Sequence, residues 1–212
     1  MFQYQEPVDI PALQTSKLNA YDKMSFDPVT ISSLGEKFTL RPGEESDTVF
    51  AEELIREAAR NGEGFALDEF KPNGQFNRAF FKNCHLAVLC DSQMAIVGIA
   101  LYGLSMLVRT QIKETSHIYV IIRKANQNQG LGQQLLQEMS KVIRSVGYTK
   151  IMTDIYTENH KAMHMLSKAN FLVTATIPEC GYLKGYGQCN SLILVDNTNN
   201  TMFNRTSHAS KI

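Results

Sequence analysis

The chain has no excess of charge of either sign. Its 212 residues contain 21 Lys plus Arg and 21 Asp plus Glu, so the formal net charge at pH 7 is zero. No block of five like charges occurs anywhere along the chain. Proteins that bind nucleic acids or anionic membranes usually carry a basic patch or tail. The composition therefore argues against both as the main partner.

Long apolar runs, a secretory signal and clustered cysteines are also missing. The apolar stretch AIVGIALYGL at 95–104 is far shorter than the roughly 20 residues that a membrane helix needs. The first residues, MFQYQEPVDIP, lack the basic start and apolar core of a secretory signal, so we expect a cytoplasmic protein. The cysteines have no C-x-x-C spacing, and neither a zinc site nor a disulfide framework is indicated. They are Cys84, Cys90, Cys180 and Cys189.

The last three residues offer a second expectation about location. Ser210-Lys211-Ile212 differs from the peroxisomal address Ser-Lys-Leu only in its final residue. Short matches of this kind are frequent by chance. Peroxisomal targeting therefore stands beside the cytoplasm as an alternative.

Length and local composition predict one main domain. A chain with 43% hydrophobic residues can bury one substantial core. Residues 1–35 mix Pro, Gln, Ser and Asp without periodicity, and we expect an arm that packs on the domain. Residues 36–196 carry the periodic segments of that domain. Residues 197–212, which are rich in Asn, Thr and Ser, are expected to form a mobile tail.

The order of strands and helices predicts a mixed α+β fold. Helical periodicity is found at 44–65, 131–146 and 159–170. Alternating or β-branched segments predict seven strands in the remaining sequence. These lie at 36–43, 85–91, 95–105, 116–124, 150–156, 171–177 and 190–196. Such an order places helices on the faces of a mixed sheet.

The stretch NQNQGLGQQLL at 126–136 lies between a predicted strand and a predicted helix. A helix that starts there presents unpaired N–H groups and the positive end of its dipole, which together favour an anion. Gly130 and Gly132 would let a phosphate approach the main chain. Leu135 follows where the dinucleotide fingerprint needs a small residue, and no Gly-Lys-Ser/Thr is present. The stretch predicts an anion site of another kind.

Two motifs identify that kind. Gln127-x-x-Gly130-x-Gly132 resembles the Gln/Arg-x-x-Gly-x-Gly/Ala signature of the GNAT superfamily of N-acetyltransferases. Downstream, ENHKAMHMLSKANF resembles the second motif of that family, through Asn159, Ala162, Asn170 and Phe171. The resemblance covers residues 36–195. It implies a GNAT-like central, mostly antiparallel, twisted sheet of about six to seven strands flanked by helices.

A third segment resembles one branch of the family. IPECGYLKGYGQCNSLILVD, residues 177–196, is similar to a branch that includes a yeast acetyltransferase acting on azetidine-2-carboxylate and proline-related compounds. The match rests on this short segment alone.

The resemblance also implies how acetyl-CoA, the acetyl donor, is bound. Backbone groups near the end of the predicted strand at 116–124 would pair with the pantetheine arm as an added strand. The glycine-containing turn would bind the pyrophosphate, and the second motif would flank the thioester. The residues implied are Ile121, Ile122, Arg123, Gln127, Asn128, Gln129, Gly130, Leu131, Gly132, Asn159, Ala162 and Leu166.

The residue that takes the proton from the acceptor amine is less clear from the sequence. At pH 7 a lysine-like amine of pKa about 10.4 loses its proton at a cost of roughly 4 to 5 kcal/mol, and an α-amine at about 1. The strand positions where relatives often carry a base align with Ser116 and Ile118, and neither is a base. Glu114 shares their face if the strand extends back. His117 has a suitable side chain, but alternation turns it to the opposite face unless a bulge intervenes.

The acid that protonates the departing thiolate is also open. Many relatives carry a Tyr where this chain has Leu166, but a thiolate of pKa about 8.5 can leave without an acid. Tyr182 or Tyr186 could substitute, or could simply form part of the wall. Asn159 could instead donate a hydrogen bond at the reacting centre. His160 and His164 are spaced like metal ligands, but no third ligand is evident, and we expect no metal.

Three functions follow from these observations. The first is an acetyl-CoA-dependent N-acetyltransferase that acts directly on the amine of a small molecule, an amine or amino acid, as a monomer or homodimer. The second is a protein or peptide N-acetyltransferase. The third is a catalytically degenerate acetyl-CoA-binding module, suggested by the missing Tyr and by the absence of a base at the aligned positions.

Overall fold

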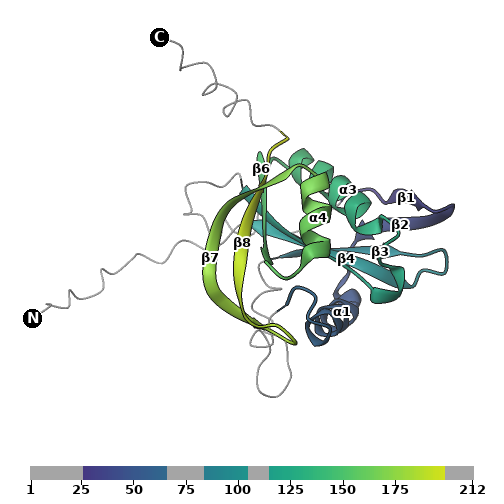
Figure 1. Ribbon diagram of the computed structural model, residues 1–212. Coiled ribbons are helices and arrows are strands. Elements are labelled where there is room, and N and C mark those ends of the chain that lie inside the picture. The colour runs from purple at the N-terminus through teal and green to yellow at the C-terminus, as the bar shows by residue number, and fades with distance from the viewer. Residues whose placement is uncertain (1–25, 66–83, 105–114, 199–212) are drawn as a thin grey trace, which may run out of the picture.

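The computed structural model describes residues 26–65, 84–104 and 115–198. In this part of the chain the strands form one eight-stranded sheet in the order β1-β2-β3-β4-β5-β6-β8-β7, with helices on both faces (Figure 1). The strands are β1 (Val29–Ser33), β2 (Glu36–Pro42), β3 (His85–Cys90), β4 (Ile96–Leu104), β5 (Thr115–Ile122), β6 (Lys150–Tyr156), β7 (Phe171–Leu183) and β8 (Gly187–Asp196).

The sheet is antiparallel except at one junction. Every neighbouring pair is antiparallel apart from β5 and β6, which are parallel. This confirms the predicted mixed α+β fold with a mostly antiparallel sheet. The count of eight strands is close to the six to seven expected.

The additional strand is β1, which lies in the stretch expected to be an arm. It pairs with β2 from Val29 opposite Leu40 to Ser33 opposite Glu36. Between the two strands lie only Leu34 and Gly35, both with positive φ, at 50° and 85°. Two-residue hairpin turns of this kind need positive φ at both positions. Part of residues 1–35 therefore belongs to the sheet, while the division into arm, domain and tail stays a prediction.

Helix α1 covers one face of the sheet. It spans Thr48–Arg60 and follows the short 3-10 helix η2 (Glu45–Asp47). Its buried residues recur at intervals of three and four, which gives a single apolar stripe. The stripe packs with Val88, Ile99 and Ile121 from β3, β4 and β5. The buried residues of α1 are Ala51, Leu54, Ile55, Ala58 and Ala59.

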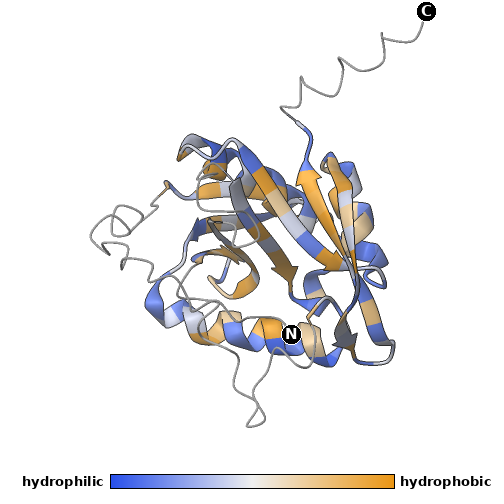
Figure 2. Ribbon diagram, turned by 90° about the vertical axis from the view of Figure 1, so that its left-hand side faces the viewer, coloured by the Kyte–Doolittle hydropathy of each residue, from blue (hydrophilic) through white to orange (hydrophobic). Residues whose placement is uncertain are grey.

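Helices α3 (Leu131–Ser145) and α4 (His160–Lys168) cover the opposite face (Figure 1). Figure 2 shows the central strands as largely apolar, whereas apolar and polar residues alternate along the helices. The predicted apolar face of α3 is buried, except that Val146 at its end is 36% exposed. None of the helices in the described ranges combines the length and apolarity needed to cross a membrane.

The strands β7 and β8 are longer than the sequence predicted. They form one antiparallel hairpin from Phe171 opposite Asp196 to Leu183 opposite Gly187. The tip of this hairpin meets the loop after α1, because a Cβ added to Gly62 would lie 2.5 Å from the Lys184 carbonyl oxygen. The hairpin therefore curves across the end of the sheet toward α1 (Figure 1).

Candidate active site

The site is created where β5 and β6 separate. The two strands pair only at three positions, from Thr115 opposite Lys150 to His117 opposite Met152. Beyond them β5 continues along β4, and β6 continues along β8. Among the described residues, the edge of β5 that faces β6 therefore has no strand beside it from Ile118 to Ile122. A cavity of about 380 Å³ fills the resulting wedge and is lined by both strands.

The N-terminus of α3 forms one wall of this cavity. The chain leaves β5, passes through the 3-10 helix η4 (Lys124–Asn126) and enters α3 at Gly130, which has φ +78°. No side chain caps this helix. Its first N–H groups therefore remain available at the cavity wall, together with the positive end of the helix dipole. The sequence predicted an anion site at this turn, and the structure places the turn beside an open strand edge.

The two glycines of the turn have different roles. Gly130 adopts a left-handed conformation, and a Cβ added there would meet nothing closer than Gln134 Nε2 at 4.0 Å. Gly132 was expected to leave room for a phosphate, but a Cβ there would lie 2.9 Å from Met165 Sδ. Its missing side chain also allows α3 and α4 to pack closely, and room for a phosphate stays a prediction.

Helix α4 supplies the second wall. Asn159 caps it, because its Oδ1 accepts a hydrogen bond from the Ala162 N–H at 3.1 Å. Three of its cavity-lining side chains, Lys161, His164 and Lys168, are polar or charged. Leu166, in the position where many relatives carry a Tyr, is buried and also lines the cavity.

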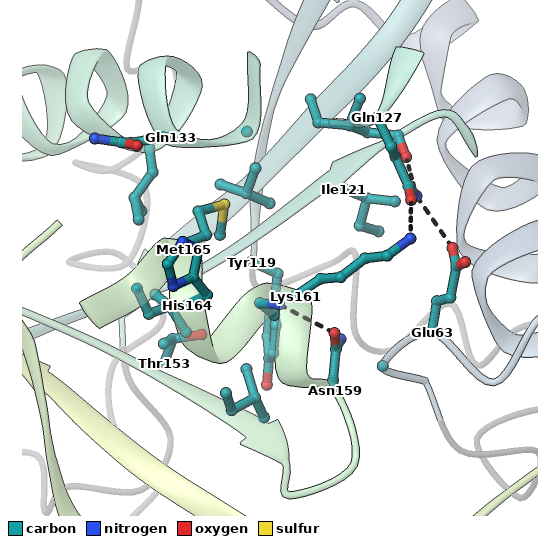
Figure 3. A pocket seen from close by; sticks show the side chains of 18 of the residues that line it. Glu63, Tyr119, Ile121, Gln127, Gln133, Thr153, Asn159, Lys161, His164 and Met165 are labelled. Carbon is teal, nitrogen blue, oxygen red and sulfur yellow. Dashed lines mark hydrogen bonds between the residues drawn. The ribbon is translucent and has the colours of Figure 1, made fainter. Parts of the chain in front are cut away.

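The Gln127 side chain ties three segments together at the mouth of the cavity. Its Nε2 donates to Glu63 Oε2 at 3.0 Å and to the Ile122 carbonyl at 3.1 Å. Its Oε1 accepts from Lys161 Nζ at 3.4 Å. Figure 3 shows these three side chains pointing toward one another from the loop after α1, the turn before α3 and α4. The glutamine of the motif thus links three of the segments that line the site.

A polar cluster bridges the strands where the wedge begins. The Tyr119 hydroxyl donates to Asp154 Oδ1 at 2.6 Å. His117 Nε2 lies 2.9 Å from the same oxygen, although not on the line of a well-directed hydrogen bond. The His117 and Tyr119 rings stack with centroids 4.5 Å apart. We refer to His117, Tyr119 and Asp154 as the wedge cluster.

The wedge cluster keeps the Asp154 carboxyl ionised. Burial raises the pKa of this carboxyl, but the polar contacts of His117 and Tyr119 lower it by more. The pKa of Asp154 therefore lies below its ordinary value. The negative charge of Asp154 therefore lies at the point where the cavity reaches the paired part of the sheet.

The catalytic candidates from the sequence are placed very differently. Asn159 lines the cavity. His117 lies behind Asp154, on the face opposite Ser116 and Ile118 as alternation required, and is not part of the cavity lining. Ser116 is fully buried, and its Oγ donates to the Gly103 carbonyl at 3.1 Å. Tyr182 is 56% exposed and does not line the cavity. Glu114 lies outside the described residues.

Most of the predicted cofactor residues are brought together in the cavity lining, and two are not. Arg123 and Gln129 do not line it. Arg123 continues β5, with its N–H donating to the Val97 carbonyl at 2.8 Å. The Gln129 carbonyl accepts a hydrogen bond from the Ser33 hydroxyl of β1. The predicted residues that line the cavity are Ile121, Ile122, Gln127, Asn128, Gly130, Leu131, Gly132, Asn159, Ala162 and Leu166.

The sequence analysis missed Tyr119, Asp154 and Glu63. Tyr119 shares the strand face of His117, so parity could have placed it there. Asp154 could not be found in this way, because neither segment's sequence predicts the register in which β5 and β6 pair. In the described part of the chain, no group of three His, Cys, Asp or Glu side chains is arranged to hold a metal ion.

A comparison with protein families identifies the family of this chain. Residues 51–171, more than half of the chain, match the model of the acetyltransferase (GNAT) family. The chain belongs to the GNAT family. It is an acetyl-CoA-dependent N-acetyltransferase, and acetyl-CoA is its acetyl donor.

Solved structures share the fold of this GNAT acetyltransferase. A GCN5-related N-acetyltransferase from Kribbella flavida is 18% identical over 74% of this chain and 96% of its own, with a TM-score of 0.63. A phosphinothricin acetyltransferase from Sinorhizobium meliloti, in complex with acetyl-CoA, is 16% identical over 74% and 86%, with a TM-score of 0.62. A ribosomal-protein-alanine N-acetyltransferase from Brucella melitensis is 17% identical over 74% and 98%, with a TM-score of 0.60.

A search among curated protein sequences found no match. The comparisons give no specific support to the branch that acts on azetidine-2-carboxylate. For this GNAT acetyltransferase they establish the family and the donor, and leave the acceptor to the geometry of the site.

The residues present fit acetyl-CoA. The uncapped start of α3 suits a pyrophosphate, and Lys161 and Lys168 add positive charge along the same cavity. The open edge of β5 offers backbone groups to an extended ligand, as an added strand would use them. The donor supplies an activated acetyl group at its thioester. The protein's part is to align that group with an amine and to handle the amine's proton.

Proposed function

We propose that the protein acetylates the amine of a small molecule, an amine or an amino acid. The observation that carries this proposal is the cavity between β5 and β6, which has walls from β5, β6, α3 and α4 and reaches Tyr119 and Asp154 of the wedge cluster. About 380 Å³ is near the lower end for small-molecule sites. After the pantetheine arm is placed, the remaining space suits a compact acceptor.

The chemistry of the walls supports an amine that arrives as a cation. On the side of the cavity toward α1 lie two carboxylates, Glu63 and Asp154. Lys124 Nζ lies 3.8 Å from Glu63 Oε1, and Gln127 also binds this carboxylate, so Glu63 is partly neutralised. The Asp154 carboxylate is contacted by His117 and Tyr119 and keeps its charge. An ammonium group is favoured at this carboxylate over an anion.

Within that class, the resemblance of residues 177–196 to the branch that acts on proline-related compounds favours cyclic amino acids. In the structure this segment is the outer part of the β7–β8 hairpin, whose tip lies against the loop after α1. That loop carries Gly64 and Phe65, which line the cavity. The hairpin is therefore placed to influence the acceptor side of the site.

The test is a competition among acceptors. The full chain is incubated with acetyl-CoA and pooled primary amines, amino acids, proline, azetidine-2-carboxylate, phosphinothricin and short peptides. Mass spectrometry then identifies which molecule gains an acetyl group, and thiol release measures the rate. We expect a free small amine or amino acid to be acetylated. Acetylation of peptides alone would replace the proposal with a peptide acetyltransferase, and donor binding without any transfer would leave an acetyl-CoA-binding module.

A further inference from the structure

We propose that Asp154 is the catalytic residue that binds the acceptor ammonium and takes its proton, with His117 and Tyr119 as positioning residues. This inference rests on the proposed function, because it assumes an amine acceptor. It assigns a role to a carboxylate that neither the motifs nor the family comparison single out.

The position of Asp154 supports the assignment. The residue follows the last paired position of β6 by two, so its side chain lies on the same face of the sheet as His117 and Tyr119. Its side chain keeps 32% of its surface exposed, and the residue lines the cavity. A carboxylate at the start of the wedge faces a ligand that enters between the strands.

The contacts of Asp154 leave one oxygen for a ligand. Tyr119 and His117 both approach Oδ1, at 2.6 and 2.9 Å. Oδ2 receives neither contact. Fixing one oxygen from two side chains sets the plane of the carboxylate, which is what an aligned proton transfer requires. Oδ2 is therefore the oxygen that accepts an N–H from the acceptor.

The donor and acceptor sides of the cavity are separate. Pyrophosphate-binding groups come from α3 and α4, on the face of the sheet that carries Leu131 and Leu166. Tyr119 packs on the other cluster, with α1. An acceptor held by Asp154 thus approaches the thioester from the α1 side. The donor and the acceptor therefore reach the wedge from opposite faces of the sheet.

The proton can then be followed from atom to atom. The ammonium N–H donates to Asp154 Oδ2 and its proton passes to the carboxylate. The neutral nitrogen attacks the thioester carbon, the C–N bond forms and the C–S bond breaks. The sulfur leaves with the bonding pair and takes the second N–H proton, which gives the amide and the thiol of CoA. Asp154 then releases the proton from Oδ2 to solvent through the exposed part of its side chain, so that one proton is released overall.

The experiment compares variants on the acceptor that the wild-type protein uses. Asp154→Asn keeps the size of the side chain and removes its charge. We expect kcat/KM for an alkyl ammonium acceptor to fall by about 100-fold or more, in the range usual for loss of a general base. Acetyl-CoA affinity should stay within about 3-fold, since the change lies on the acceptor side. Asp27→Asn, at an exposed position outside the cavity, is the matched control.

An arylamine that is neutral at pH 7 separates this role from a structural one. It has no proton to lose before attack, so Asp154→Asn should slow its acetylation far less than that of the alkyl ammonium. Equal losses for both acceptors would contradict the assignment. Tyr119→Phe and His117→Gln should each reduce turnover of the charged acceptor by about 10-fold, and should add little to Asp154→Asn in double variants.

A measurement on the wild-type protein covers the case in which Asp154→Asn does not fold. An N,N-dimethyl analogue of the acceptor carries an N–H but cannot be converted to an amide. It should inhibit competitively with the acceptor and at least about 10-fold more strongly than the neutral carbon isostere. Equal inhibition by the two compounds overturns the inference. If the wild-type protein acetylates no amine at all, the proposed function itself fails, which is a different outcome.

Discussion

Replacing Gly130 with Asp tests the donor site directly. The residue has φ +78°, and an added Cβ would have nothing closer than 4.0 Å. The structure therefore accepts the side chain at the cost of about 1 to 2 kcal/mol for the left-handed backbone, and Asp tolerates that region better than most residues. A carboxylate at the start of α3 also returns some stability through the helix dipole. The variant should fold.

The same carboxylate should greatly weaken acetyl-CoA binding. Placed about 5 Å from a pyrophosphate charge, it repels by roughly 3 kcal/mol at an effective dielectric constant of 20. A loss of 3 kcal/mol corresponds to about 150-fold in Kd. Isothermal titration calorimetry with acetyl-CoA measures this loss. Stabilisation by saturating donor, about 2.7 kcal/mol at 100 times Kd for the wild-type protein, should nearly disappear.

Two controls separate charge from strain. Gly147 also has positive φ, at 101°, has nothing near its Cβ and lies beyond the other end of α3. Gly147→Asp should match the backbone cost and leave donor binding unchanged. Gly130→Asn keeps the shape without the charge and should lose much less affinity than Gly130→Asp. If Gly130→Asp folds and binds acetyl-CoA within about 3-fold of the wild-type protein, the donor site is not at this turn.

Three further changes test the framework around the site. Gln127→Ala removes the hydrogen bonds to Glu63 and to the Ile122 carbonyl. Denaturant titration should show a free energy of unfolding lower by about 1 to 2 kcal/mol, and calorimetry should show weaker acetyl-CoA binding. Leu135→Ala, at a fully buried position of α3, should cost about 2 to 5 kcal/mol in the same titration, and a smaller loss would mean that the helix packs loosely. The hydrogen bond from Arg41 lowers the pKa of Asp47, so this carboxylate stabilises the fold above its unfolded pKa of about 3.9, and that contribution is lost as the pH falls through the lower folded value. Asp47→Asn should therefore destabilise the protein at neutral pH by about 2 to 3 kcal/mol and flatten the fall in melting temperature on acidification; an unchanged profile would show that the pair contributes nothing.

The sequence predicted those parts of the fold that depend on local pattern. The apolar positions of α3 and the Asn159 cap of α4 are visible in single segments, and both helices begin where these signals lie. β1 escaped notice because its turn contains Leu34 at positive φ, where a turn residue such as Asn or Gly is the usual signal. The sheet gained a strand for that reason.

The residues of the candidate site likewise fall into those that a local pattern predicts and those that only the tertiary structure brings together. The turn at 127–132 could be recognised because its residues are consecutive. The wedge cluster could not, because Tyr119 and Asp154 are 35 positions apart and meet only through the register between β5 and β6. Gln127 was expected to lie beside the pyrophosphate. Its hydrogen bond to Glu63, 64 positions away, links two segments of the site, and no local sequence pattern predicts such a long-range contact.

The short pairing of β5 with β6 has a mechanical consequence. In the described part of the chain, three residue pairs form the ladder between the strands β1–β5 and the strands β6–β8. A ligand bound between the two groups of strands should restrict their relative motion, since it forms hydrogen bonds with one group and packs against the other. Hydrogen exchange should therefore slow at 118–122 and 153–155 together when the donor binds, and the rigidity of the whole sheet should follow the cellular ratio of acetyl-CoA to its Kd.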